Sequence, residues 1–231
     1  MQKILKSTCF TLLLLVSMVN IMTAQSKDVG NFSGVSTSGN LDVKLIKSDS
    51  PSLKIKMIKG NAEDVITTVK GNDLTLKIKN KWGVFNNKTK AKIIVYYTEL
   101  NDIDASAGSS IIAENEISSN NLDIDASSGS SINLGIAATD LEVDCSSGAS
   151  VVLKGETKNA DYDASSGASI VAKNVVAKRV RAEASSGASI GCHAADKIKA
   201  EASSGASISY RGEPKEKDIS KRVSGSVGRS N

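Results

Sequence analysis

The sequence predicts an all-β fold: a single-stranded β-helix (β-solenoid) of about six rungs, with an N-terminal β-strand region packed at one end. A Ser-Gly-Ala/Ser-Ser tetrad recurs about every twenty residues, and apolar and polar residues alternate on both sides of it. Aromatic residues make up only 3% of the 231-residue chain, so we expect a thin core of Ala, Val, Ile and Leu. One histidine and three cysteines exclude zinc-finger spacing, a multi-histidine metal centre and a disulfide-rich scaffold.

The first 24 residues have the pattern of a secretory signal peptide. Lys3 and Lys6 precede an apolar run over 9–19, and Ala24 offers a cleavage point. The alternative is an N-terminal membrane anchor, but the run is shorter than the roughly 20 apolar residues that spanning requires. Cys9 precedes the apolar run, whereas a lipidated cysteine would follow it. We therefore expect an exported protein with no transmembrane segment after the signal peptide is removed.

Charge divides the remaining chain into regions. Without the signal peptide the net charge is 27 − 25 = +2, which is too close to neutral to predict binding of nucleic acid. Residues 41–100 hold twelve lysines and six acids, whereas 101–210 hold eight basic and fifteen acidic residues. We expect an N-terminal β-strand region over 25–100, a Ser-Gly-Ala-Ser repeat β-solenoid over 101–212, and a polar C-terminal tail or cap over 213–231.

The repeat carries the strongest structural information. Its glycines are spaced 18 to 21 residues apart, at Gly108, Gly129, Gly148, Gly167, Gly187, Gly205 and Gly225. Apolar residues occupy the same columns in each copy, five and three residues before the glycine and three and five after it. Such columns indicate strands that stack ~4.8 Å apart with like residues above one another. An antiparallel meander or sandwich of short strands is the alternative, but it does not require the columns to repeat.

The N-terminal region contains less regular strands. Apolar residues alternate with polar ones over 41–45, 53–57 and 74–78, and residues 93–97 form a more continuous apolar run. Lysines fill the polar positions, which is a common means of preventing strands from associating edge to edge. We expect these strands to begin or cap the solenoid.

Several of these segments resemble the family called putative auto-transporter adhesin, head GIN domain. The segments are Phe32-Ser33-Gly34-Val35, residues 40–45 (Asn-Leu-Asp-Val-Lys-Leu), residues 72–78 (Asn-Asp-Leu-Thr-Leu-Lys-Ile), and the Ser-Gly-Ala-Ser units from 147 onward. The similarity runs from about residue 32 to 212. The resemblance implies an exported β-helical protein of Gram-negative bacteria, in the periplasm, at the outer-membrane surface or outside the cell. Adhesion is the role proposed for that family, and no enzymatic activity is assigned to it.

One column of the repeat is the candidate functional site. The position four residues before the glycine is acidic in six copies, namely Asp104, Asp125, Asp144, Asp163, Glu183 and Glu201. Stacking would place these carboxylates in one exposed acidic column, which could contact glycans or bind cations such as Ca²⁺. The alternative is a hydrated outer face whose repulsion is screened by salt and by neighbouring lysines. We predict no catalytic residues, no metal site and no cofactor.

Two functional hypotheses follow. The chain is either a non-catalytic binding module for an unknown surface ligand, a glycan or a protein, or a purely structural scaffold of the cell envelope. A polysaccharide-cleaving β-helix is less favoured, because 101–210 contain no break in the repeat that would build a catalytic pocket.

Cys145 and Cys192 belong to different columns two rungs apart, ~10 Å along the axis, so we expect two buried free thiols. The oligomeric state stays open.

Overall fold

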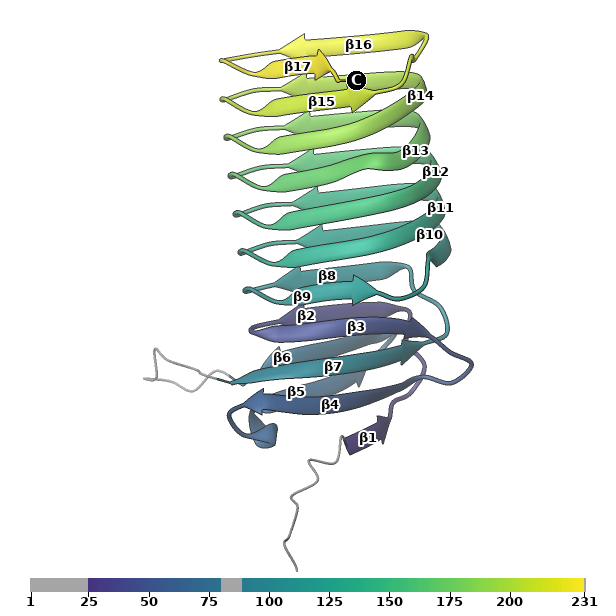
Figure 1. The fold of residues 1–231 in the computed structure, drawn as a ribbon, viewed down its shortest axis with the longest axis vertical. Helices are drawn as coiled ribbons and strands as arrows, with labels where there is room; N and C mark the ends of the chain where they lie inside the picture. The colour runs from purple at the N-terminus through teal and green to yellow at the C-terminus, as the bar shows by residue number, and fades with distance from the viewer. Residues whose placement is uncertain (1–24, 80–88, 231) are drawn as a thin grey trace, which may run out of the picture.

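The computed structural model describes residues 25–79 and 89–230 and confirms the predicted β-solenoid. Apart from one short 3₁₀ helix, η1 (Ala62–Asp64), its elements are strands stacked along the long axis of the molecule (Figure 1). The repeat makes about seven turns, against about six predicted. The predicted signal peptide, 1–24, lies outside the described residues. Within the described ranges, no helix has the length and hydropathy that a membrane span requires.

Each rung of the repeat has one strand before the glycine turn and one after it. The strands are β8 (Asp102–Ser106), β9 (Ser110–Ala113), β10 (Ile117–Ala126), β11 (Ser131–Cys145), β12 (Ser150–Ala164), β13 (Ser169–Ala184), β14 (Ser189–Ala202), β15 (Ser207–Arg211), β16 (Glu216–Lys221) and β17 (Ser226–Arg229). From β11 to β14, each strand follows one glycine turn, rounds the opposite corner and leads into the next turn (Figure 1). The segments that lead into the glycine turns form one wall of the solenoid, which we call the pre-turn sheet. The segments that follow the turns form the other wall, the post-turn sheet.

The glycine turns are type I′ turns that bond to one another along the axis. In the third copy, Ser147 and Gly148 have φ of 51° and 71°, and the Ala149 N–H donates to the Ser146 carbonyl at 3.0 Å. The Gly148 N–H donates to the Ser166 carbonyl of the next rung at 3.1 Å, and the glycines of the other turns from Gly108 to Gly205 make the equivalent bond, whereas Gly225 donates within its own turn. The glycine therefore supplies both the left-handed conformation and a hydrogen bond between rungs.

The first rung in the sequence is the second in the stack. Its strands are β2 (Gly34–Ser38) and β3 (Leu41–Lys47), and the strands of the rung below are β6 (Asp73–Ile78) and β7 (Lys90–Tyr97). Strand β2 pairs in parallel with β6 on one side and β8 on the other, while β3 lies between β7 and β9. The N-terminal region therefore contributes two rungs to the solenoid itself.

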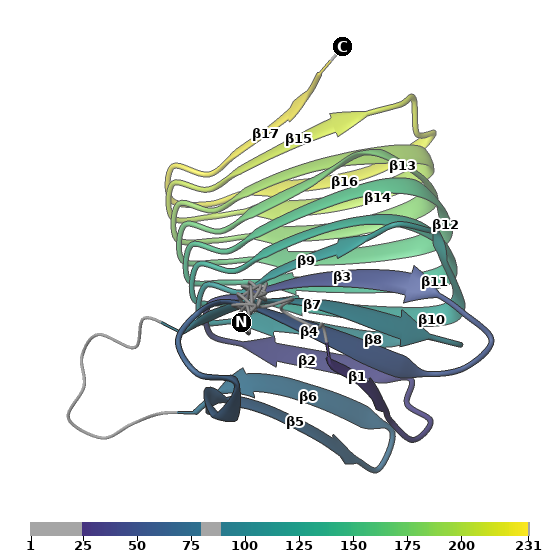
Figure 2. The same cartoon turned by 60° about the horizontal axis from the view of Figure 1, so that its bottom comes forward.

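Antiparallel strands cover the N-terminal end of the stack (Figure 2). Strand β4 (Ser52–Lys59) pairs with β7, β1 (Gln25–Asp28) pairs with β4, and β5 (Val65–Lys70) pairs with β6. At the other end, β16 and β17 pair in parallel with β14 and β15, so residues from the predicted tail or cap form the last turn. Both ends of the repeat thus have further strands bonded to them.

The core is a thin layer between the two sheets, because every second residue of each strand points inward. Small residues fill the column three before the glycine, where the walls converge at the turn; its buried members are Ala105, Ala126, Cys145, Ala164, Ala184 and Ala202. Cys145 and Cys192 are buried and free, as expected. Burial raises the pKa of the two thiols, to about 11 for Cys145 and about 12 for Cys192, so both are apolar packing groups at neutral pH.

The largest fully buried side chain between the repeat walls carries an unsatisfied hydroxyl. Tyr162 is fully buried, its hydroxyl has no hydrogen-bond partner, and burial raises its pKa. We expect Tyr162→Phe to increase the free energy of unfolding by about 1 kcal/mol, because the change removes a buried polar group that is not hydrogen-bonded. Thermal melting should show a rise of about 2–4 °C. Tyr96→Phe, at a partly exposed site, is the control and should change little; a destabilised Tyr162→Phe variant would contradict the prediction.

Candidate functional site

The six predicted acidic residues form one column on the outer surface of the pre-turn sheet. In the strand register Asp104 lies opposite Asp125, which lies opposite Asp144, and the series continues through Asp163 and Glu183 to Glu201. Each is flanked in its strand by buried residues, so alternation directs all six side chains outward. The structure therefore brings together every member of the acidic column.

A second column of acids lies beside the first and was missed in the sequence analysis. It occupies the position six before the glycine and consists of Asp102, Asp123, Glu142 and Asp161, which are aligned by the same register. Its acidic character ends after β12, since the aligned residues are Arg181 in β13 and Lys199 in β14. We call the eight carboxylates of both columns from β8 to β12 the acidic face. The recurrence of acids at this position was readable in the sequence.

The lower part of the acidic face lacks neutralising charges. Among the described residues, no lysine or arginine forms an ion pair with Asp102, Asp123, Asp125, Glu142 or Asp144. Burial, followed by repulsion from Asp144 and Asp104, raises the pKa of Asp125 to about 6. Burial and nearby carboxylates also raise the pKa of Asp102, Asp144 and Asp163. Any positive charge or hydrogen-bond donor that approaches these groups would relieve their repulsion.

The upper part of the acidic column is neutralised by bases from the neighbouring column. Arg181 donates to both carboxylate oxygens of Asp161 at 2.9 Å and to Glu183 at 2.5 Å. Lys199 lies 3.1 Å from Glu201 and lowers the pKa of that carboxyl. The six residues therefore do not form a uniform column, because Asp104 to Asp144 belong to an anionic region and Glu183 and Glu201 to ion pairs.

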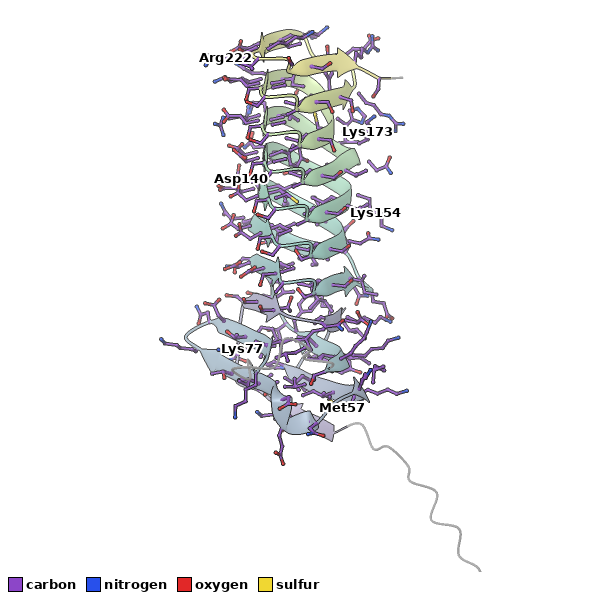
Figure 3. The ribbon with its side chains drawn as sticks, turned by 90° about the vertical axis from the view of Figure 1, so that its left-hand side faces the viewer. Met57, Lys77, Asp140, Lys154, Lys173 and Arg222 are labelled. Carbon is purple, nitrogen blue, oxygen red and sulfur yellow. The ribbon has the colours of Figure 1, made fainter. Side chains whose placement is uncertain are left out.

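A shallow hollow of about 360 Å³ lies where the two regions meet. Asp123, Glu142 and Asp161 line one part of it, and Arg179, Arg181, Lys197 and Lys199 line the other. Asn159 donates to Asp140 at 2.6 Å and accepts a hydrogen bond from Arg179 at 2.8 Å, so a polar network forms part of its lining. Asp140 projects from this side of the molecule in Figure 3, opposite Lys154 and Lys173. The hollow offers both hydrogen-bond acceptors and donors to a polar ligand.

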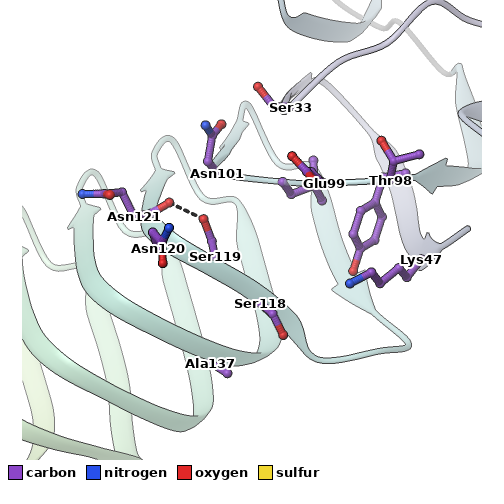
Figure 4. A pocket seen from close by; sticks show the side chains of 12 residues that line it. Ser33, Lys47, Thr98, Glu99, Asn101, Ser118, Ser119, Asn120, Asn121 and Ala137 are labelled. Carbon is purple, nitrogen blue, oxygen red and sulfur yellow. Dashed lines mark hydrogen bonds between the residues drawn. The ribbon is translucent and has the colours of Figure 1, made fainter. Parts of the chain in front are cut away.

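Another hollow, of about 580 Å³, lies at the corner opposite the glycine turns (Figure 4). Residues 98–101 and 118–121 line most of it, all of them uncharged except Glu99, and Ser119 donates to the Asn121 carbonyl at 2.6 Å. Lys47 and Glu99 are its charged residues, so it lacks the pair of carboxylates that glycoside hydrolysis requires. In the two described ranges, no group of three or more His, Cys, Asp or Glu side chains is arranged to hold a metal ion.

Comparisons with known proteins agree with the resemblance seen in the sequence. The family described as "Putative auto-transporter adhesin, head GIN domain" matches residues 31–214. The crystal structure of a putative adhesin from Bacteroides fragilis is similar, with 25% identity and a TM-score of 0.81 over 90% of this chain and 96% of that chain.

Two structures from Parabacteroides distasonis cover the same shares of both chains. One is described as a putative lipid binding protein (18% identity, TM-score 0.72) and one as a putative adhesin (19% identity, TM-score 0.69). At these identities the likeness shows the fold alone. No curated protein matches the chain. With its family match covering most of the sequence, the chain belongs to the family of the putative auto-transporter adhesin, head GIN domain.

Proposed function

We propose that the chain is a non-catalytic, exported binding module whose pre-turn sheet contacts a glycan or protein on a surface. The observation that carries the proposal is the acidic face, in which one carboxylate on each of four successive rungs has no ion-pair partner among the described residues and has a raised pKa. These carboxylates are Asp102, Asp125, Asp144 and Asp163. Carboxylates accept hydrogen bonds from sugar hydroxyls and from the basic side chains of proteins. Family membership supports an adhesin-like role.

The arrangement of the site supports binding rather than catalysis. General acid–base catalysis needs two groups whose environments separate their pKa values around one reacting bond. Here the raised pKa values belong to a row of equivalent carboxylates on a broad outer surface, and burial shifts them in the same direction. Export to the periplasm, the outer-membrane surface or the medium belongs to the same proposal.

Binding of the full mature chain to glycan arrays and to cell surfaces tests this function. In the triple variant Asp123→Asn, Asp125→Asn, Asp144→Asn, we expect binding to fall by about tenfold or more, because three charge-assisted hydrogen bonds would be weakened. The matched control replaces exposed acids outside the pre-turn sheet, as Asp28→Asn, Asp49→Asn, Glu63→Gln, and should bind as the wild type does. Equal binding by the triple variant would exclude the acidic face, and no specific binding to any surface would favour the scaffold.

A further inference from the structure

The outer surface of the post-turn sheet carries an aliphatic stripe. Ile94, Ile112, Val152 and Val171 occupy one outward column, in which the register also places Lys44 and Asn133. The side chains of Ile112, Val152 and Val171 are 46%, 37% and 43% exposed. These positions face away from the core, so the exposed fractions are not a result of incomplete packing between the sheets.

Lysines surround the lower end of the stripe. Lys54 lies opposite Ile94 and Lys56 opposite Lys92 in the pairing of β4 with β7. Lys44, Lys54, Lys56 and Lys92 line a hollow of about 500 Å³, together with Ile94 and Ile112. Lys54 also lies over the ring of Tyr96, 5.2 Å from its centroid. The lining of the hollow therefore combines aliphatic side chains with four lysines.

The positive charge extends along the same face. Lys154 and Lys173 project from this side of the stack, opposite Asp140 (Figure 3). The acids near the lysine-bordered hollow, Asp42 and Glu114, are paired with Lys90 and Lys44. Lys54, Lys56 and Lys92 form no ion pair with a described acid, so their charges remain available. The molecule consequently has a positive, aliphatic face and an acidic face on opposite walls.

We infer that the post-turn face docks on the surface of an anionic lipid bilayer. Lysine ammonium groups would bind the lipid phosphates, while the exposed Ile and Val side chains would enter the boundary between head groups and acyl chains. Repulsion would direct the acidic face away from the bilayer, which gives the docked molecule a single orientation. A soluble polyanion matches the lysines equally well, but it would gain nothing from the exposed aliphatic stripe.

Flotation of the full mature chain with lipid vesicles tests the inference. We expect binding to vesicles that contain about 30% phosphatidylglycerol in phosphatidylcholine and little binding to phosphatidylcholine alone, because each lysine near an anionic surface changes the partition coefficient about fivefold. Lys54→Gln, Lys56→Gln, Lys92→Gln should therefore reduce partitioning by about 100-fold. The matched control, Lys77→Gln, Lys217→Gln, Lys221→Gln, removes the same charge from the other wall and should retain most of the binding.

The aliphatic stripe has its own variant. Ile112→Ser, Val171→Ser should lower partitioning into anionic vesicles by about tenfold and leave the binding of soluble heparin unchanged. The inference is overturned if the chain ignores anionic vesicles, if the control lysines matter as much as the hollow, or if the serine variant binds vesicles normally. The triple variant Asp123→Asn, Asp125→Asn, Asp144→Asn should bind anionic vesicles as the wild type does. The same variant should lose binding to glycans or cell surfaces, so the two proposals can fail independently.

Discussion

Gly155→Ala is expected to lower the free energy of unfolding by about 3–5 kcal/mol, the largest effect that we predict for a single substitution. Gly155 lies in β12 with φ of 129°, a backbone conformation that residues with a Cβ rarely adopt. A Cβ at this position would lie 1.8 Å from the carbonyl oxygen of Ile136, its partner in the preceding rung. The rungs would have to separate there, because the obstructing atom belongs to the backbone. Thermal melting should show a fall of about 10 °C.

Two other glycines make the measurement specific. Gly135, in β11, has only ordinary van der Waals contacts around the position that a methyl group would occupy, so Gly135→Ala should be close to neutral. Gly148→Ala tests the turn conformation alone, since nothing lies within 4 Å of its Cβ position, and it should cost about 1 kcal/mol. If Gly155→Ala melts within about 2 °C of Gly135→Ala, the close approach of the two rungs at this corner is wrong.

The double variant Asp125→Asn, Asp144→Asn should be more stable than the wild type at pH 7.5 and equally stable at pH 4. Both carboxyls have folded-state pKa values above the unfolded value of 3.8, about 6 for Asp125. Between pH 4 and 6 the folded state therefore binds more protons than the unfolded state, so its stability falls as the pH rises through this window. Because both side chains are exposed, solvent screening limits the gain at pH 7.5 to about 1 kcal/mol.

Denaturant unfolding of both proteins from pH 4 to 8 measures this difference directly. The gain should shrink in 1 M NaCl, since salt screens repulsion between exposed carboxylates. Asp218→Asn, opposite Lys199 in the register of β14 with β16, serves as the control and should show no gain. A double variant that is less stable than the wild type at pH 7.5, or equally stabilised at pH 4 and 7.5, would contradict the assigned repulsion.

The repeat made most of the solenoid predictable. Recurrence of the same residue type in each column indicated that copies stack in register, and the pairing of Asp104 with Asp125 and its successors follows from that alone. The switch of the neighbouring column to Arg181 decides which carboxylates keep a net charge, and it needed the side-chain geometry to be recognised.

The order of the first rungs could not be predicted in the same way. Strand β2 lies between β6 and β8 through parallel pairings to distant parts of the chain, and no repeated column marks these partners. Lys54 and Lys92 occupy the outward, solvent-facing positions that the alternation predicted, but the sequence did not show that both belong to the post-turn sheet. Local alternation shows which side chains of a strand point outward, but it does not show which of the two sheets the strand belongs to.

The bond from each turn glycine to the following turn has a consequence for how such proteins can vary in size. Residues 149–167 form one complete unit, and the corresponding units bond through equivalent atoms to the units on either side. Losing or duplicating a whole unit would shorten or lengthen the molecule by ~4.8 Å and leave every other unit in alignment. A difference of a single residue between units is absorbed locally, as between β12 and β13, where the register shifts between Val152 and Lys154 and the interior columns are aligned again by Ala160. The reach of the protein can therefore change in discrete steps while both of its surfaces keep their character.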